Sequence, residues 1–162
     1  MRYVGLFLLG LFLLAGAAVA QAPTFQPVAT VSQIMLAVTY PYSDNLLYIE
    51  RNPPKDDREW AVLQSQALML AESGNLLMME GRAKDQGDWM KDARLLVDAG
   101  VAAVKATRAK DMQAVLELND QIVTACTTCH TAYHPGYRRR RQAAQPKSGV
   151  APPANPPAST PQ

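Results

Sequence analysis

Apolar residues recur at intervals of three and four in four segments of the chain, and this spacing constrains the fold more than any other sequence feature. It is the period of an α-helix with one buried face, whereas no segment alternates as a half-buried β-strand does. Thr30, Asp56 and Asp88 stand at the starts of three segments, where their side-chain oxygens are expected to cap helix N-termini, and the last segment is expected to start near Asp111. Short loops join the segments. We therefore predict an all-α fold, an antiparallel up-and-down four-helix bundle within residues 21–137.

Prolines and glycines modify this pattern at a few positions. Pro41 lies inside the first segment, where its missing N–H group and its ring are expected to kink or break the helix. Pro135 and Gly136 follow the last segment and are expected to end it. Gly74 and Gly100 lie on apolar faces, where the lack of a side chain is expected to let neighbouring helices approach closely.

The two ends of the chain differ in composition from the segment between them. Arg2 precedes an uncharged apolar block, and Ala18-Val19-Ala20 then precedes a polar Gln21. This order is typical of a secretory signal peptide, and the block is shorter than the roughly 20 apolar residues of a membrane span. We expect a signal peptide over 1–20, a helical domain over 21–137 and a disordered, basic, Pro/Ala-rich tail over 138–162. The mature protein is then expected in the periplasm, without a stable membrane span.

Charge is distributed unevenly between the expected domain and its tail. Residues 21–137 carry ten Lys/Arg and fourteen Asp/Glu, whereas Arg138–Arg141 and Lys147 have no acidic neighbour in the tail. Such a tail is either simply solvated or docks on an acidic partner or a lipid surface, in which case binding depends strongly on salt. Nucleic acid is not an expected partner, because export separates the protein from it.

Both cysteines and both histidines of the chain lie within nine residues. Cys126-Thr127-Thr128-Cys129-His130 has the form C-x-x-C-H, which is the attachment signature of c-type haem. On a helix, positions three and four apart share a face, so two thiols can bond the haem vinyl groups while the imidazole binds the iron. Tyr133 continues the same face.

Three other interpretations fit the cysteines less well. A disulfide would close a very small loop inside an ordered helix and would stabilise little. A thioredoxin-like pair requires a βαβ setting, and no strands are expected. A zinc site would combine Cys126, Cys129, His130 and His134, but structural zinc sites normally join two separated pairs of ligands.

The region Val28–Tyr137 resembles the class II c-type cytochromes, which are cytochrome c′ and its low-spin, methionine-ligated relatives. The resemblance rests on C-x-x-C-H-x-x-Y in the last helical segment, since class I cytochromes carry the motif near the N-terminus. It implies a haem inside the bundle with its distal face against the first helix. Members are often antiparallel dimers, so a homodimer is among the expected assemblies. The chain departs from the family where His134 follows the tyrosine in place of a basic residue, and at Pro41.

The first helix offers one candidate for the distal iron ligand. In the low-spin relatives a methionine on that helix binds the iron, and in cytochrome c′ a bulky apolar side chain blocks the same position. The resemblance places Met35 there, with Met78 or Met79 as alternatives. Methionine also fills gaps in helical cores, so Met35 is expected either to bind the iron or only to pack.

These residues predict a periplasmic c-type cytochrome with one covalent haem c, whose iron is held by His130 and Met35. Such a protein would pass single electrons between redox partner proteins and would not be an enzyme. If Met35 only packs, the alternative is a five-coordinate, cytochrome c′-like protein that binds nitric oxide or carbon monoxide. A third hypothesis is a haem-free structural or metal-binding bundle.

Overall fold

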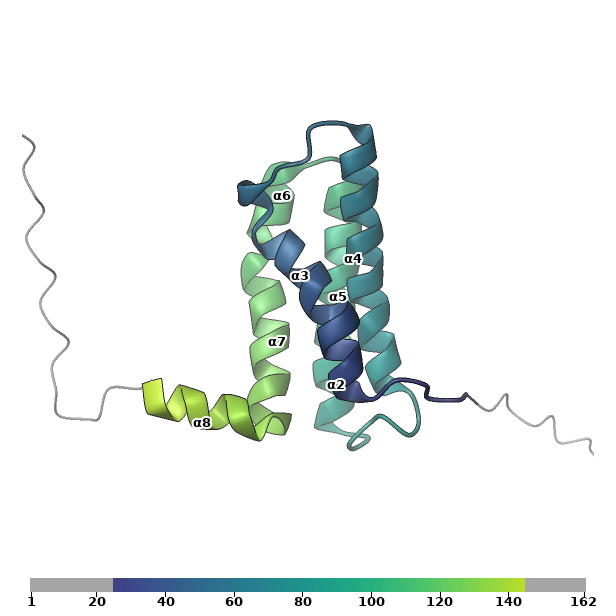
Figure 1. The fold of residues 1–162 in the computed structure, drawn as a ribbon, viewed down its shortest axis with the longest axis vertical. Helices are drawn as coiled ribbons and strands as arrows, with labels where there is room; N and C mark the ends of the chain where they lie inside the picture. The colour runs from purple at the N-terminus through teal and green to yellow at the C-terminus, as the bar shows by residue number, and fades with distance from the viewer. Residues whose placement is uncertain (1–24, 145–162) are drawn as a thin grey trace, which may run out of the picture.

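The computed structural model describes residues 25–144, and over this range the fold is all-helical, as the periodicity predicts (Figure 1). The signal peptide expected over 1–20 and the part of the tail after residue 144 lie outside the described residues. The elements, in chain order, are α2 (Val31–Ile34), the π-helical segment η2 (Met35–Thr39), α3 (Tyr40–Leu47), the 3₁₀ turn η3 (Ile49–Arg51), α4 (Asp57–Met78), α5 (Asp88–Arg108), α6 (Met112–Glu117), α7 (Asn119–Tyr133) and α8 (Pro135–Ala144).

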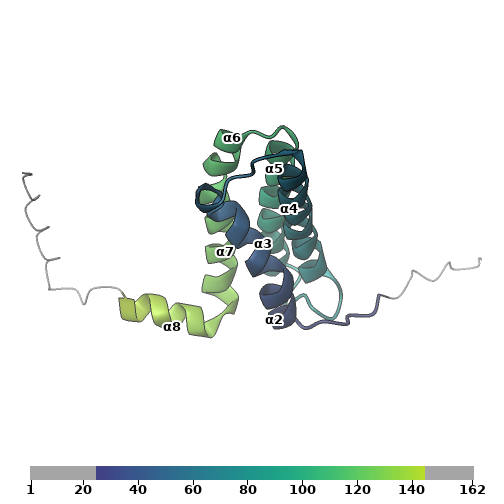
Figure 2. The ribbon, with the colours of Figure 1, turned by 45° about the horizontal axis from the view of Figure 1, so that its top comes forward.

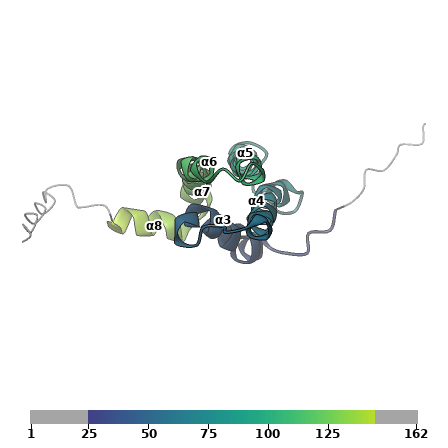
Figure 3. The same cartoon turned by 90° about the horizontal axis from the view of Figure 1, so that it is seen from above.

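Most of these helices pack into one bundle. The two longest, α4 and α5, lie against each other along their length, and α7 packs on α5 (Figures 1 and 3). The continuous segment α2–η2–α3 packs on α4 and reaches α7 through α3. Figure 2 shows that α2 and the C-terminal end of α7 diverge from this contact, and that α8 projects away from the other helices. Within residues 25–144 no helix is both long and apolar enough to cross a membrane.

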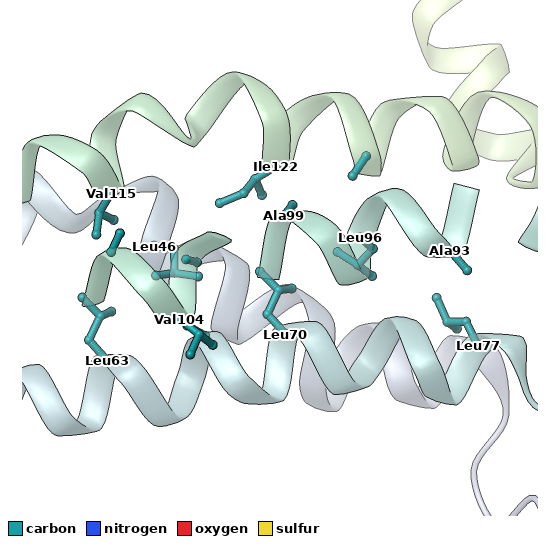
Figure 4. Close-up of a cluster of buried hydrophobic side chains, with 14 of the residues drawn as sticks. Leu46, Leu63, Leu70, Leu77, Ala93, Leu96, Ala99, Val104, Val115 and Ile122 are labelled. Atoms are coloured by element: carbon teal, nitrogen blue, oxygen red, sulfur yellow. The ribbon is translucent and has the colours of Figure 1, made fainter. Parts of the chain in front are cut away.

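The core lies between α4, α5, α7 and the first helical segment (Figure 4). Leu63, Leu70 and Leu77 are spaced by seven residues and form a buried row along α4. Each fully buried leucine of this kind contributes roughly 1.5–3 kcal/mol through removal of apolar surface from water. Across from the row lie buried residues of α3, α5, α6 and α7, which include Leu46, Leu96, Ala99, Val104, Val115 and Ile122. Val123, which follows Ile122 in α7, lies outside this core and is 46 % exposed.

Gly74 and Gly100 allow the close packing of α4 on α5, as expected. A Cβ atom at Gly100 would lie 2.5 Å from both Cα and N of Ala71, which is far closer than atoms approach in real structures. At Gly74 it would lie 2.7 Å from Cγ2 of Val97. The two helices are therefore in backbone-to-backbone contact at the level of Gly100.

Of the two expected effects of Pro41, a break in the first helix does not occur, but the helix is locally distorted before the proline. The chain stays helical from Val31 to Leu47, and the turn before the proline widens into the π-helical segment η2. There Tyr40 N–H donates to the carbonyl of Met35, five residues back. A proline inside an α-helix lacks a donor and its ring collides with the carbonyl four residues back. The wider π turn accommodates both effects without ending the helix.

The C-terminal end of the bundle also differs from the expectation. α7 ends at Tyr133, but Pro135 and Gly136 then begin a new helix, α8, instead of terminating the helical structure. Proline suits a first helical turn because the N–H that it lacks would have no partner there. The boundary expected between residues 137 and 138 falls inside α8, and Arg138–Arg141 are helical.

Candidate functional site

The C-x-x-C-H residues lie in the C-terminal half of α7. Ile122 and Ala125, the buried residues of this helix, fix it against the core. Cys126, Cys129 and His130 follow on the adjoining face; all three are half-buried, and both cysteines are free thiols. Spacings of three and four residues place them on one side of a continuous helix, as the sequence predicts.

Burial and nearby charge hold both thiols in the protonated form. Burial raises the pKa of Cys126 above its ordinary value. Burial also raises the pKa of Cys129, to about 11, and the negative charges of Asp92 and Cys126 add to the effect. At neutral pH both side chains are therefore thiols rather than thiolates, the less reactive form of cysteine.

His130 is held as a neutral imidazole at the end of the bundle. Burial lowers the pKa of His130, and the neighbouring His134 lowers it further. The centroid of its ring lies 5.6 Å from that of His134 and 5.5 Å from that of Tyr137 in α8. Nδ1 of His134 accepts a hydrogen bond of 3.0 Å from Tyr137 N–H, which orients this ring away from a ligand role through Nδ1. Neutral imidazole is the form that binds iron.

Tyr133 connects α7 to the start of α5 through a set of contacts that we call the Asp85 latch (Asp85, Trp89 and Tyr133). The Tyr133 hydroxyl donates to Oδ2 of Asp85, and its ring meets Trp89 edge-on at a centroid distance of 4.9 Å. Trp89 in turn donates from Nε1 to the carbonyl of Leu77 in α4, at 2.8 Å. The last turn of α7 is thus tied to both α5 and α4.

Asp85, rather than Asp88, accepts hydrogen bonds from the backbone N–H groups at the start of α5. Asp88 was expected to cap α5, but it is the first helical residue, and Gly87 occupies the N-cap position without a side-chain hydrogen bond. Instead, Oδ1 of Asp85 accepts from Gly87 N–H at 2.8 Å and from Trp89 N–H at 3.1 Å. An aspartate two residues before a glycine at a helix start is the local signal that could have indicated this turn.

The Asp85 latch shifts the pKa values of Tyr133 and Asp85, and these shifts can be tested. Its hydrogen bond raises the pKa of Tyr133 from 10 to about 12 and lowers the pKa of Asp85. The contribution of Tyr133 to the stability of the fold is complete below pH 10 and is lost as the pH rises through 12. The contribution of Asp85 is present at neutral pH and is lost as the pH falls through the lowered pKa of this carboxyl group. In an alkaline absorbance titration we expect the last tyrosine to ionise near pH 12, and this phase to be absent from Tyr133→Phe.

Urea unfolding gives a second readout of the same variant. Tyr133→Phe should lower the unfolding midpoint at neutral pH, and its difference from the unsubstituted protein should shrink at pH values below the pKa of Asp85, where the acceptor is protonated. Tyr48→Phe is the control, because Tyr48 is 45 % exposed and its ring faces the Arg51 guanidinium. Equal effects of both substitutions, independent of pH, would contradict the role of the latch.

Asp92 is a second acidic residue that the sequence analysis missed. It lies on α5 with a side chain that is 8 % exposed, and its charge acts on the Cys129 thiol of α7. Burial raises the pKa of Asp92, with further contributions from the negative charges of Asp88 and Asp85. Its spacing was the available signal, because Asp92 lies three residues after Trp89 and four before Leu96, which are both buried on the apolar face of α5.

Met35 is the first residue of η2 and is half-buried. It packs against the same hydrophobic core as Cys126 and Tyr133, although η2 packs chiefly on α3 and α4 whereas α7 packs on α5. Of the alternative methionines, Met78 also packs on the core. The sulfur of Met79 accepts a hydrogen bond of 3.0 Å from the Arg82 guanidinium, so this methionine is already engaged.

The cysteine and histidine side chains of α7 differ in how well they suit a zinc ion and a covalent haem. Among residues 25–144, no three His, Cys, Asp or Glu side chains come together to hold a metal ion, which disfavours the zinc interpretation. Covalent haem requires a different donor set, namely two free thiols three residues apart and an adjacent neutral imidazole, and Cys126, Cys129 and His130 provide it. The residues present therefore fit a haem.

Comparison of the chain with models of protein families, with curated proteins and with solved structures gave no match. The resemblance to class II cytochromes therefore depends on the C-x-x-C-H-x-x-Y residues and their position in the chain.

Proposed function

We propose that the protein is a periplasmic c-type cytochrome that carries one covalently attached haem and transfers single electrons. The observation that supports this function best is the grouping of two free, half-buried thiols and a neutral imidazole on one face of α7. The proposal includes an antiparallel up-and-down order of four helical units, formed by α2–η2–α3, α4, α5 and α6–α7. It also includes export with loss of residues 1–20 and redox partner proteins in the same compartment.

Each residue of the site has a separate proposed role. When bound, the haem supplies the one-electron chemistry. Cys126 and Cys129 would hold it by thioether bonds, in which each thiol adds across a vinyl group, with the sulfur bonding one carbon and the hydrogen the other. His130 would bind the iron through its neutral ring. The Asp85 latch would keep the last turn of α7 in place while the charge at the site changes.

Met35 is the proposed distal ligand. It is half-buried, borders the core that Cys126 also borders, and has a sulfur with no charged partner of the kind that Met79 has in Arg82. His130 and Met35 would then both hold the iron, and a histidine–methionine pair raises the reduction potential of a haem, which suits an electron carrier.

The ligand assignment is tested by the absorption spectrum of Met35→Ala. We expect the unsubstituted protein to show a low-spin spectrum and the variant to lose it, while the haem stays in the protein fraction during acid-acetone extraction. Met69→Ala is the matched control, because Met69 is 39 % exposed on α4, and it should leave the spectrum unchanged. An unaltered spectrum in Met35→Ala would show that another group binds the iron.

One observation favours a second candidate function. The segment η2, which carries Met35, packs chiefly on α3 and α4, whereas α7, which carries the motif, packs chiefly on α5. If Met35 only packs, the iron is five-coordinate and the protein binds nitric oxide or carbon monoxide. Carbon monoxide added to the reduced, unsubstituted protein distinguishes the two: an immediate spectral change supports the gas-binding candidate, and an unchanged spectrum supports the electron carrier.

A further inference from the structure

The helix α8 carries a concentrated positive charge that the proposed function does not yet use. Arg138, Arg139, Arg140 and Arg141 are consecutive and exposed, and no acidic residue lies in the helix. Successive residues of a helix point about 100° apart, so the four guanidinium groups surround it on all sides. Within the described residues the ion pairs join Lys91 to Asp88 and Lys110 to Asp57, so the arginines of α8 are not engaged with the bundle.

This charge lies directly beside the candidate site. α8 begins two residues after α7 ends, and the ring of Tyr137 is 5.5 Å from that of His130. Arg141 extends over the same tyrosine, with its guanidinium carbon 6.0 Å from the ring centroid. Arg141 is thus connected to the imidazole of His130 through a single aromatic residue, so a molecule bound to this arginine and the start of α8 would lie near His130.

We propose that α8 is the docking element for an acidic redox partner protein, which it places against the His130 side of the site. The inference rests on the proposed function, because it assigns the partner of the same redox centre. Guanidinium groups form bidentate pairs with carboxylates, and clustered charge raises the rate of productive encounter.

The composition of α8 favours a protein partner over a membrane. A helix that lies on a lipid surface needs an apolar face that enters the acyl chains, usually with Leu, Phe or Trp. The apolar residues of α8 are Tyr137, Ala143 and Ala144, and the tyrosine is turned toward His130. Four arginines without an apolar face match an acidic protein surface.

The test measures electron transfer from the reduced haem protein to two small oxidants, anionic ferricyanide and a cationic cobalt tris-phenanthroline complex. The variant replaces Arg138, Arg139, Arg140 and Arg141 with glutamine. The control makes the same change of charge at the opposite end of the bundle, at the N-terminus of α4 and the C-terminus of α5 (Figure 1), with the exposed residues Lys55, Arg58, Lys105 and Arg108 replaced by glutamine.

Salt screening makes the oxidation rate depend on charges near the haem rather than on the net charge of the whole protein. α4 has 22 residues and is about 33 Å long, whereas charges are screened over about 10 Å at 0.1 M salt. At this salt concentration we expect the α8 variant to react with ferricyanide about tenfold more slowly and the control variant to change less than twofold. The cationic oxidant should react faster with the α8 variant. Equal rates for the two variants would overturn the proposal, whereas a protein that cannot be reduced would overturn the proposed function instead.

Binding measurements identify the class of partner. We expect the haem protein to bind poly-L-glutamate in low salt, and the α8 variant to lose at least nine tenths of this binding. Stronger binding to phosphatidylglycerol vesicles than to poly-L-glutamate would overturn the protein assignment in favour of a membrane. A dimer in sedimentation experiments that dissociates in the α8 variant would overturn it in favour of a second copy of the chain.

Discussion

A chain in which Cys126 and Cys129 are both replaced by alanine is expected to be recovered from the periplasm without attached haem. Both proposed bonds to the cofactor start from these sulfur atoms, and a neutral imidazole alone holds a haem reversibly. The mass of the isolated polypeptide should be lower than that of the unsubstituted protein by one haem, beyond the loss of two sulfur atoms. After acid-acetone extraction, all visible absorption should be in the solvent.

The single cysteine variants and a nearby control substitution show whether the loss of haem is due to the loss of both sulfur atoms. Cys126→Ala or Cys129→Ala alone should keep one thioether bond and therefore the full haem mass, at reduced yield. Thr128→Ala changes an exposed residue between the two cysteines and should behave as the unsubstituted protein does. A covalent haem in the double variant, or an unmodified polypeptide mass in the unsubstituted protein made with haem-attachment machinery, would disprove the proposed function.

Gly100→Ala is expected to be the most destabilising small substitution in the bundle. The new Cβ atom would lie 2.5 Å from the backbone of Ala71, so α4 and α5 must separate to accept it. Overpacking of this kind costs about 3 kcal/mol, and the better helix propensity of alanine returns about 1 kcal/mol. The net loss, about 2 kcal/mol, is a large share of the 5–15 kcal/mol of a typical domain and should be measured by urea unfolding.

Two other glycines calibrate this prediction. At Gly74 the new Cβ atom would lie 2.7 Å from Cγ2 of Val97 and 2.9 Å from the backbone oxygen of Ala93, both longer than the 2.5 Å at Gly100, so Gly74→Ala should also destabilise the bundle but by less. At Gly87 the nearest atom is a carboxylate oxygen of Asp85 at 3.5 Å, an ordinary contact, so Gly87→Ala should cause no overpacking and should cost only what alanine costs at an N-cap position. A Gly100→Ala protein as stable as the unsubstituted one would contradict the backbone contact between α4 and α5.

The sequence predicts the helices and most of the core because these depend on local spacing. Leu63, Leu70 and Leu77 share a face of any helix that contains them, whatever the helix packs on. The break expected at Pro41 does not occur, because that expectation used only the cost of proline in a regular α-helix. The chain instead shifts to a π turn, since the residues on either side are held in the core by Ile34 and Leu46.

In the candidate site, too, the contacts between residues close in sequence could be predicted, whereas those between residues far apart in sequence could not. Cys126, Cys129 and His130 are neighbours in sequence, so their common face could be predicted from helix geometry. Asp85 contacts Tyr133 across 48 positions of the chain, and no pattern in either segment indicates that they meet. The contact of Tyr137 with His130 was missed because Pro135 and Gly136 were expected to end the last helix, and no further helix was expected to begin there.

The π turn at η2 has a consequence for how a site of this kind changes over evolution. Such a turn contains one residue more than an α-helical turn, and one residue corresponds to a rotation of about 100°. Deleting a single residue from 36–39 would remove the wide turn that accommodates Pro41 and would turn Met35 by about that angle relative to Leu46 in the core. If Met35 binds the iron, a one-codon deletion would take its sulfur away from the iron, although every candidate ligand residue would still be present in the chain.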